Sequence, residues 1–465
     1  MKKYTYLFLL LFGATFATLL SSCQGEDRRL EYKDTKGVND WIYGEMKDVY
    51  LWYDEIPAES KLNFYANPDT FFYTLLSSKE KKNGNYYSWI EQKEVTTKSI
   101  DDSSSYGFEF MSYTDEKNSS VYVRVLYVLP GSPASTAGLK RGDWIIAFDG
   151  NKITSTNYTQ LFTGSGVKLT LATYTGNSTN PFTEKGTLTL GAAKAVNNDP
   201  ILVNKVLTST SGSKIGYLMY THFATGPNDN ANDYTYQNEL RQLFASFKSQ
   251  NVTEFVLDLR YNPGGYISNS QLLSTMLAPS SALGKTFCVI KYNDKMSPSQ
   301  NIYTFDSDSI KGGANLNLPR LYVLVSKYTA SSSELLINGL KPFMNVTLIG
   351  TTTEGKNLGS ISIQHKESNW MIQPIIGKLY NSKNESDYGS GFTPDYELDE
   401  FSDYSTYKEL GDENEMMLSK ALALINGASL TKSTRTKSIS TVLNAKQSSL
   451  DRKKTNGAWL APIKR

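Results

Sequence analysis

Residues 255–265 read FVLDLRYNPGG, and this stretch decides the fold of the 465-residue chain. Its first five residues are almost continuously apolar, as in a strand that is buried on both faces of a sheet. Upstream, residues 215–221 predict another strand, and residues 234–249 predict a helix because apolar side chains recur every three or four positions. The order strand, helix, buried strand is typical of an α/β layer.

The same alternation continues downstream. Residues 321–326 predict a strand, residues 331–340 a helix, and residues 346–350 a further strand. A last helix is expected over residues 413–425, just before a glycine. These elements extend the predicted α/β layer toward the C-terminus.

A β-rich stretch precedes this domain. From residue 105 to about residue 193, short alternating apolar runs are separated by glycine and asparagine, which predicts short strands and turns. Residues 106–110 read YGFEF and residues 128–145 read VLPGSPASTAGLKRGDWI. Together the two stretches resemble a PDZ domain.

By that resemblance, backbone N–H groups of the first stretch would hold the carboxylate of a peptide C-terminus, beside the strand to which the peptide adds. A structural β module with an unused groove is the alternative. The residues assigned to peptide binding are Tyr106, Gly107, Phe108, Glu109 and Phe110.

The first residues predict an export signal. Lys2 and Lys3 precede an apolar run over residues 6–20, which is too short for a stable transmembrane helix. Residues 20–23 read LSSC and resemble the lipobox of bacterial lipoproteins, in which the cysteine thiol is lipidated. Cys23 is therefore the expected lipidation site. An ordinary signal peptide with an incidental cysteine is the alternative.

The four residues after Cys23 read QGED and resemble short signals that send some lipoproteins to the outer face of the outer membrane. A solvated tether explains these acids equally well. We expect a cell-envelope protein that is lipid-anchored to the outer membrane, on its periplasmic or its surface-exposed face. Beyond the tether, residues 38–53 carry apolar side chains at helical spacing and predict a helix.

The C-terminal residues are strongly basic. Residues 431–465 contain nine lysine or arginine residues, a single acid, Asp451, and few large apolar side chains. This composition predicts a mobile tail. We do not expect it to bind nucleic acid in an exported protein.

Histidine is the usual partner of a catalytic serine, but the chain has only His222 and His365. Neither lies in a setting that indicates catalysis, so both are predicted to be structural. The sequence has no Gly-x-Ser-x-Gly motif and no cluster spaced for zinc. If Cys23 is lipidated, Cys288 is a lone and buried thiol. No metal or organic cofactor is expected.

Lysine is the alternative base. Its free pKa of about 10.4 keeps it protonated at neutral pH, so it can accept a hydroxyl proton only where burial favours the neutral amine. Lys356 fits this requirement, because it ends the run LIGTTTEGK that follows a predicted strand. The nucleophile is expected at a strand-to-helix turn, and residues 329–334, TASSSE, provide one. Ser331 with Glu334 is also a helix capping box, which the local pattern alone favours.

Three motifs in a fixed order point to a family. They are LDLRYNPGG at residues 257–265, TASSSE at residues 329–334 and GK at residues 355–356, behind the PDZ-like stretch. Together they resemble the carboxy-terminal processing peptidases, also called tail-specific proteases, over about residues 105–400. The resemblance implies a ClpP/crotonase-like α/β serine protease domain that hydrolyses peptide bonds without a metal or organic cofactor.

The resemblance also implies roles for single residues. Ser331 would be the nucleophile and Lys356 the general base. The oxyanion hole would combine the N–H group of Gly264 or Gly265 with that of Ser332, since glycine lets the backbone approach a substrate carbonyl closely.

Two positions depart from the family pattern. Ser360 stands where many members carry a glutamine that orients the lysine, and Pro342 stands where some carry an acid. Ser360 is the expected third catalytic residue, through a hydrogen bond to the lysine. These departures keep open an alternative function, a cell-envelope lipoprotein that binds peptides and has lost turnover. The 31 tyrosines leave a glycan-binding lipoprotein as a third class.

These expectations describe a multidomain α/β (α+β) chain. The expected function is that of a serine-type endopeptidase of the cell envelope, whose partners are proteins or peptides recognised through their C-termini. Its expected parts are a lipoprotein signal peptide (1–22), a tether with a helical N-terminal region (23–100), a PDZ-like domain (103–195), a protease domain (200–427) and a basic tail (428–465).

Overall fold

The computed structural model of the chain falls into two units. The first unit contains residues 34–92, 292–299 and 360–377, and the second contains the other described residues. The predicted signal peptide and Cys23 lie outside the described part of the chain. Within that part, every helix is too short or too polar to span a bilayer. The described residues are 34–92, 104–115, 117, 119–177, 180–227, 232–401, 407–428 and 443–453.

The first unit begins with a helix over residues 34–49, close to the predicted range. It buries Ile42, Met46 and Val49, which recur at helical spacing on one face. The elements that follow it are η1 (Tyr53–Glu55), η2 (Glu59–Lys61), α2 (Pro68–Thr74), η3 (Ser78–Glu80), β1 (Lys81–Lys82) and β2 (Asn85–Tyr86).

A small antiparallel sheet completes the first unit and joins distant parts of the sequence. β3 (Trp89–Gln92) pairs with β21 (Trp370–Gln373), which also pairs with β20 (Ile363–Gln364). Residues 360–377 therefore belong to the first unit, although the sequence predicts them within the protease domain. A local sequence pattern does not indicate which distant strand will be the pairing partner.

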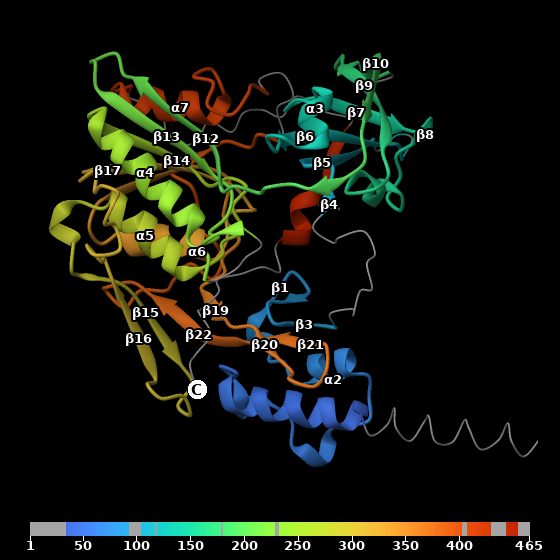
Figure 1. The fold of residues 1–465 in the computed structure, drawn as a ribbon, viewed down its shortest axis with the longest axis vertical. Coiled ribbons are helices and arrows are strands. Elements are labelled where there is room, and N and C mark those ends of the chain that lie inside the picture. Colours follow the sequence, from blue (N-terminus) through green and yellow to red (C-terminus); the bar gives the residue numbers. More distant parts are fainter. Residues whose placement is uncertain are drawn as a thin grey trace, which may run out of the picture. The chain divides into compact units, whose positions relative to one another are not determined.

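The PDZ-like module forms an antiparallel sheet in the second unit (Figure 1). Its core is lined by alternate strand residues such as Phe108, Phe110, Val123 and Val125, because successive side chains of a strand point to opposite faces. Its elements are β4 (Ser104–Ser105), β5 (Phe108–Asp115), β6 (Val121–Val128), α3 (Pro133–Ala137), β7 (Trp144–Phe148), β8 (Asn151–Lys152), η4 (Tyr158–Leu161), β9 (Val167–Tyr174), β10 (Phe182–Leu190) and β11 (Lys194–Ala195).

One more strand closes the edge of this sheet. β24 (Leu443–Ser448) pairs with β5 and is followed by η7 (Ser449–Lys453). We call residues 443–453 the C-terminal segment. The prediction of a mobile tail is wrong for this segment, because Leu443 and Leu450 are buried. The average composition of the tail does not reveal that these two leucines are buried.

The predicted protease domain contains a six-stranded sheet in the order β12-β13-β14-β17-β18-β23. β12 is antiparallel to β13, and the other neighbours are parallel. The four predicted strands of this domain correspond to β13, β14, β17 and β18. The strands are β12 (Ile201–Thr208), β13 (Lys214–Tyr220), β14 (Val252–Asp258), β17 (Arg320–Val325), β18 (Asn345–Gly350) and β23 (Tyr396–Glu397).

Helices cover both faces of this sheet, and Figure 1 shows α7 and α4 on opposite sides of it. α7 begins later than predicted because the carboxylate of Glu415 accepts the N–H groups of Met417 and Leu418. The predicted α/β fold class with a β-rich module and a helical N-terminal region is confirmed. The other elements are α4 (Thr235–Ser249), α5 (Ile267–Leu277), η6 (Ser280–Ala282), β15 (Thr286–Tyr292), β16 (Gln300–Thr304), α6 (Ser332–Leu340), β19 (Leu358–Ser360), β22 (Ile375–Tyr380) and α7 (Met416–Ile425).

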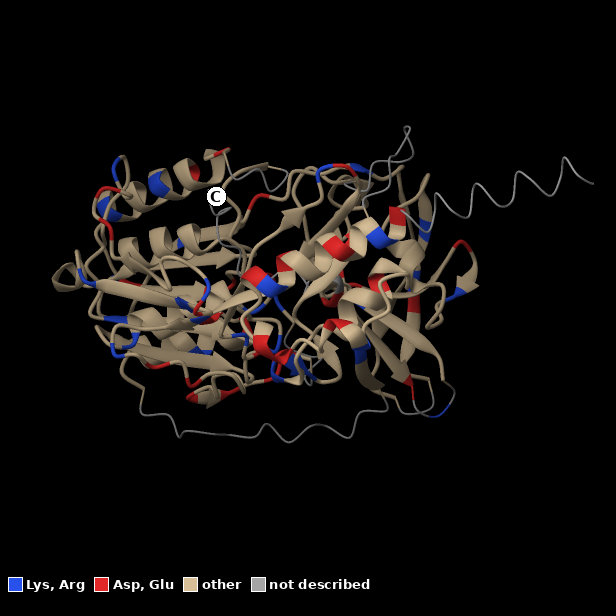
Figure 2. Ribbon diagram, turned by 90° about the horizontal axis from the view of Figure 1, so that it is seen from below, with Lys and Arg blue, Asp and Glu red and all other residues tan. Residues whose placement is uncertain are grey.

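Charged residues of both signs are interspersed along the described ribbon (Figure 2). A representative exposed pair is Lys36 with Asp40, one helical turn apart, with an Nζ to Oδ2 distance of 2.6 Å. Exposed pairs of this kind contribute at most about 1 kcal/mol to stability. The buried charges near the candidate site are therefore the ones with structural consequences.

Candidate active site

Ser331 lies between β17 and α6, at the strand-to-helix turn that the sequence predicts. Residues 326–331 form this turn, which we call the serine turn. Ser331 is the N-cap of α6, is fully buried, and has φ 58° and ψ −111°. A positive φ outside glycine costs roughly 1 to 3 kcal/mol, and such strain is concentrated at functional sites.

Hydrogen bonds to the chain after β14 hold the serine turn. Thr329 Oγ1 accepts the Ser326 N–H at 2.9 Å and donates to the Leu259 carbonyl at 2.8 Å. The Ala330 N–H donates to the Asn262 carbonyl at 3.1 Å. Two of the three sequence motifs are therefore bonded to each other in one local structure.

Residues 262–265, which we call the glycine loop, pack directly on the serine turn. Gly264 has φ 110°, and a Cβ atom there would lie 2.9 Å from Ser331 Cβ and 3.0 Å from the Ala330 carbonyl oxygen. At Gly265, with φ 135°, a Cβ atom would overlap the Phe223 carbonyl. Both positions therefore require glycine.

The N–H groups of Gly264 and Gly265 differ in their hydrogen bonding. The Gly264 N–H donates to Asn262 Oδ1 at 2.9 Å and is used within the loop. The Gly265 N–H donates to no acceptor among the described residues, and the Gly265 carbonyl accepts the Ser332 hydroxyl at 2.6 Å. The Ser332 N–H is in the first turn of α6, where helices leave N–H groups without an intrahelical acceptor. Gly265 is thus the better candidate to act with Ser332.

Glu334 connects Ser331 with the loop that carries Lys356. Its Oε2 atom accepts the N–H groups of Ser331 at 2.9 Å and Lys356 at 2.8 Å. Its Oε1 atom accepts the Gly355 N–H at 2.6 Å and the Thr353 hydroxyl at 2.5 Å. A single carboxylate therefore fixes the backbone of the predicted nucleophile and that of the predicted base.

The side chain of Glu334 is fully buried. Burial raises its pKa to about 7, and hydrogen bonds from Thr353 and from three backbone N–H groups oppose the rise. The sequence indicated only the local capping role of this residue. Its contacts with the lysine loop follow from the pairing of β17 with β18, which no local pattern encodes.

Lys356 follows β18 and is 1% exposed. β17 and β18 are parallel neighbours, so their C-terminal ends lie at the same edge of the sheet. Ser331 follows the first of these strands and Lys356 the second, which agrees with the usual position of functional residues in α/β sheets. Burial also disfavours the ammonium form of an amine, as a lysine base requires.

Ser360, the predicted third catalytic residue, ends β19 and belongs to the first unit. It is buried, and its hydroxyl accepts a hydrogen bond from Gln373 Nε2 at 2.9 Å. A catalytic role for Ser360 stays a prediction.

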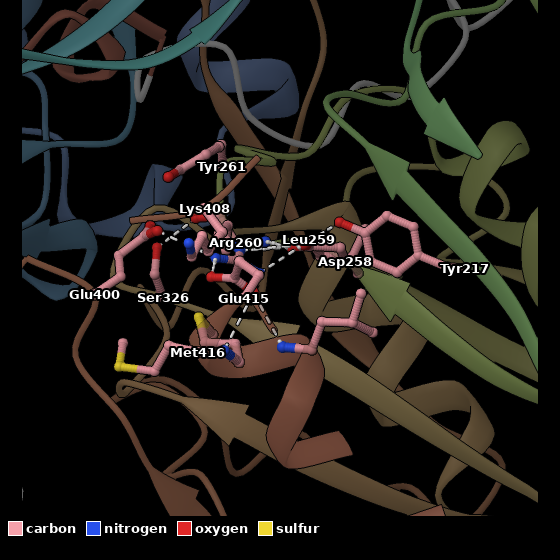
Figure 3. A network of polar contacts seen from close by, with 12 residues as sticks. Tyr217, Asp258, Leu259, Arg260, Tyr261, Ser326, Glu400, Lys408, Glu415 and Met416 are labelled. Carbon is pink, nitrogen blue, oxygen red and sulfur yellow. Dashed lines mark hydrogen bonds and ion pairs between the residues drawn. The ribbon is translucent and has the colours of Figure 1, made fainter. Parts of the chain in front are cut away.

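A buried ionic network lies just before the glycine loop. Figure 3 shows Arg260 beside Asp258, Glu400 and Glu415, with closest N to O distances of 2.9, 3.1 and 2.7 Å. Arg141 of the PDZ-like module also pairs with Glu400, at 2.8 Å. Burial alone would raise the pKa of Glu415, but its pairing with Arg260 lowers that pKa to about 2. Glu415 is therefore ionised at neutral pH.

This network connects the PDZ-like module to the serine turn. Arg141 donates to the Tyr261 hydroxyl and to the Leu126 carbonyl, both at 2.7 Å. The Arg260 carbonyl in turn accepts the Ser326 hydroxyl. The main chain that leads into the glycine loop is thus held from two sides.

The two histidines and Cys288 make structural contacts. The ring of His222, after β13, hydrogen bonds with the Thr221 hydroxyl at 3.0 Å. His365 packs on Trp41 in the first unit, with ring centroids 4.9 Å apart. Cys288 is buried in β15, which raises the pKa of its thiol. Within the described ranges, no three His, Cys, Asp or Glu residues are grouped to hold a metal ion.

The five predicted peptide-binding residues lie just before β5 and at its start. The side chains of Tyr106, Phe108 and Phe110 belong to the core of the PDZ-like module, and Glu109 is also buried. The carbonyl of Gly107 accepts the Leu129 N–H at 2.8 Å. These side chains build the module, so a peptide would have to bind mainly through the backbone edge of β5.

Comparison with known proteins agrees with this geometry. The family model described as Peptidase family S41 matches residues 214–398, and that of the Peptidase S41 N-terminal domain matches residues 37–89. A PDZ domain model matches residues 124–162. The chain belongs to peptidase family S41. The resemblance drawn from three short motifs is confirmed, and the PDZ-like module is a PDZ domain.

Individual relatives of family S41 support the same assignment. A crystal structure assigned to the S41 proteases, from Bacteroides fragilis, is 35% identical with a TM-score of 0.75, and the match covers 83% of this chain and 97% of that one. The carboxy-terminal processing protease CtpA of Bacillus subtilis is 24% identical over 327 residues, which are 69% of this chain and 62% of that one.

The carboxyl-terminal-processing protease of Picosynechococcus is 31% identical over 245 residues, which are 51% of each chain. The chain therefore spans about half to two thirds of the length of these curated relatives.

Proposed function

We propose that this chain is a serine endopeptidase in which Ser331 is the nucleophile and Lys356 the general base. One observation carries the proposal, namely that a single oxygen of Glu334 accepts the N–H groups of both residues. Membership of family S41 and the burial of both side chains support it. Glu334 is a positioning residue in this scheme.

The first half of the reaction forms an acyl-enzyme. The neutral amine of Lys356 takes the proton of the Ser331 hydroxyl while Oγ bonds to the carbonyl carbon of the scissile peptide. The N–H groups of Gly265 and Ser332 donate to the resulting oxyanion. The carbon–nitrogen bond then breaks, and the Lys356 ammonium gives its proton to the leaving amine.

The second half hydrolyses the ester. Lys356 takes a proton from a water molecule as the water oxygen bonds to the ester carbonyl carbon. The bond to Ser331 Oγ breaks, and Oγ recovers the proton from Lys356. The net reaction consumes one peptide bond and one water, and it restores the enzyme.

We also propose that substrates are proteins or peptides recognised through their C-termini, and that the protein works at the cell envelope. The names of two relatives refer to processing at carboxy termini. In the PDZ domain, β5 is the strand to which an extended peptide would add, in the place that β24 takes in the structure. The lipobox-like residues 20–23 support a lipid anchor at Cys23. Ser360 is kept as the proposed third catalytic residue.

The test is cleavage of an unstructured protein that ends in apolar residues, followed by mass spectrometry. Wild type should release peptides, and Ser331→Ala should release none. Ser280→Ala, which changes an exposed serine of the same unit, is the matched control and should retain cleavage. Cleavage by Ser331→Ala would refute the assignment. Binding of the substrate without cleavage by wild type would favour the non-catalytic peptide-binding function.

A further inference from the structure

The C-terminal segment runs along β5 in a defined direction. In the antiparallel β24–β5 ladder, Leu443 lies opposite Asp115 and Ser448 lies opposite Met111. As the segment advances, its partners move back along β5 toward residues 106–110. A peptide whose C-terminal carboxylate is held by residues 106–110 would run in the same direction on the same edge.

Serine hydroxyls continue the contact where the ladder ends. The Ser448 hydroxyl donates to the Phe110 carbonyl at 2.8 Å, and Ser449 Oγ accepts the Phe110 N–H at 2.8 Å. Ser112 Oγ accepts the Gln447 N–H at 3.1 Å and donates to the Gln447 carbonyl at 2.7 Å. Both backbone groups of Phe110 are therefore occupied by the C-terminal segment.

Two leucines anchor the segment. Leu443 is 1% exposed and Leu450 is 2% exposed, and both belong to the same apolar cluster as Met111 and Tyr113 of β5. Lys446, between them, is exposed. Main-chain pairing combined with a few buried side chains is the way in which peptides add to sheet edges.

We propose that the C-terminal segment is an intramolecular ligand of the PDZ domain, which excludes a substrate peptide from β5 until it is displaced. The edge of a sheet can pair with only one additional strand, so the segment and a peptide compete. The segment and β5 belong to the same chain, so their pairing is intramolecular and a substrate peptide has to compete with a high effective concentration of the segment. The inference rests on the proposed function, which assigns peptide binding to this edge.

The first test releases the segment. The double variant Leu443→Asp with Leu450→Asp places two charges at the buried anchors, and release returns both charges to water. The matched control is Lys446→Asp, at the exposed position of the same strand. All proteins are full chains that carry Ser331→Ala, so that no probe is cleaved.

The probe is a fluorescent synthetic peptide with the sequence of residues 443–453, LNAKQSSLDRK. The release variant should bind it at least tenfold more tightly than the parent and the Lys446→Asp control do, because its own segment no longer competes. Equal affinity in all three proteins would overturn the proposal.

The second test locks the segment in place and does not depend on how well the release variant folds. Asn444 and Thr114 lie opposite each other in the ladder, and both are partly exposed. Cysteines at these two positions, in a Cys23→Ser chain, should form a disulfide under oxidation. The oxidised protein should fail to bind the probe, and reduction should restore the affinity of the parent. Equal binding before and after reduction would contradict a shared edge.

A third measurement tests whether a substrate C-terminus binds the same edge of β5 as the probe. A peptide with an apolar, free C-terminus should displace the probe from the release variant, and its amidated form should displace it at least tenfold less well. Equal displacement by both forms, or none, would overturn competition with a substrate C-terminus.

Cleavage is scored separately with chains that retain Ser331. Cleavage with no effect of release or lock on binding overturns this inference and leaves the proposed function standing. Effects on binding without cleavage by any chain support the inference and count against the proposed function.

Discussion

Gly264 packs so closely on the serine turn that the site has no room for a side chain at this position. In Gly264→Ala, the new Cβ atom would lie 2.9 Å from Ser331 Cβ, so the turn has to move. Because misplacement of a reacting group by about 1 Å can cost roughly 100-fold in rate, we expect at least that loss in kcat/KM.

The matched control for this change is Gly212→Ala. Gly212 also has a positive φ, 86°, but a Cβ atom there meets nothing within 4 Å. It should lose roughly 1 kcal/mol of stability through backbone strain and keep its activity. Unchanged kcat/KM in Gly264→Ala, or equal activity losses in both variants, would contradict the close contact.

Glu334 makes a second prediction at the scale of one residue, through pH. Burial raises its pKa to about 7, whereas an unfolded glutamate titrates near 4.3. Between these values the native state binds the proton more tightly than the unfolded state does. The free energy of unfolding should therefore fall as pH rises from about 4.3 to about 7, by at most roughly 4 kcal/mol.

The measurement compares the Tm of wild type and Glu334→Gln from pH 4 to pH 8. The Tm of wild type should fall relative to that of the variant over this interval. The difference between the two Tm values should level off above the pKa of Glu334. Glu184→Gln, which changes an exposed glutamate, is the control and should show no such trend. A difference between wild type and Glu334→Gln that does not depend on pH would argue against a buried, titrating carboxyl.

At the scale of elements, Arg260 joins the end of β14 to the start of α7. Removal of its guanidinium in Arg260→Met would leave Asp258, Glu415 and Glu400 buried with Arg141 as the one arginine still in the network. Breaking a buried ion pair on one side costs roughly 3 to 5 kcal/mol, so the Tm should fall strongly. Activity should fall as well, because the guanidinium holds the main chain at residue 260, whose carbonyl accepts the Ser326 hydroxyl of the serine turn.

An exposed arginine provides the comparison for Arg260. Arg320 pairs with Glu254 at 2.8 Å, but its side chain is 38% exposed. Arg320→Met should therefore cost no more than about 1 kcal/mol. Similar losses of Tm in the two variants would contradict the structural importance of the buried network.

At the scale of the whole molecule, the parts that the sequence predicted well are those whose signal is local. β13, β14, β17 and β18 are buried parallel strands, so they stand out as continuous apolar runs. The family resemblance then indicated which residues at the ends of these strands to examine. In the structure, Ser331 and Lys356 follow neighbouring parallel strands.

The features that the sequence did not predict depend on partners far away along the chain. Residues 360–377 join the first unit because β21 pairs with β3. The sequence identifies Glu334 only as a capping residue, because its hydrogen bonds to Gly355 and Lys356 depend on the fold. The C-terminal segment is mostly polar between Leu443 and Leu450, and only its ladder with β5 explains why it is ordered as a strand.

The central claim is that Lys356 acts as the base for Ser331, and one substitution tests it most directly. Arginine keeps the positive charge and the donors of lysine but cannot accept a proton at neutral pH. Cleavage of an unstructured protein substrate should be compared for wild type, Lys356→Arg and the exposed control Lys168→Arg. We predict that Lys356→Arg forms no more product than Ser331→Ala, while Lys168→Arg cleaves like wild type. Product from Lys356→Arg at a rate comparable to wild type would contradict the account.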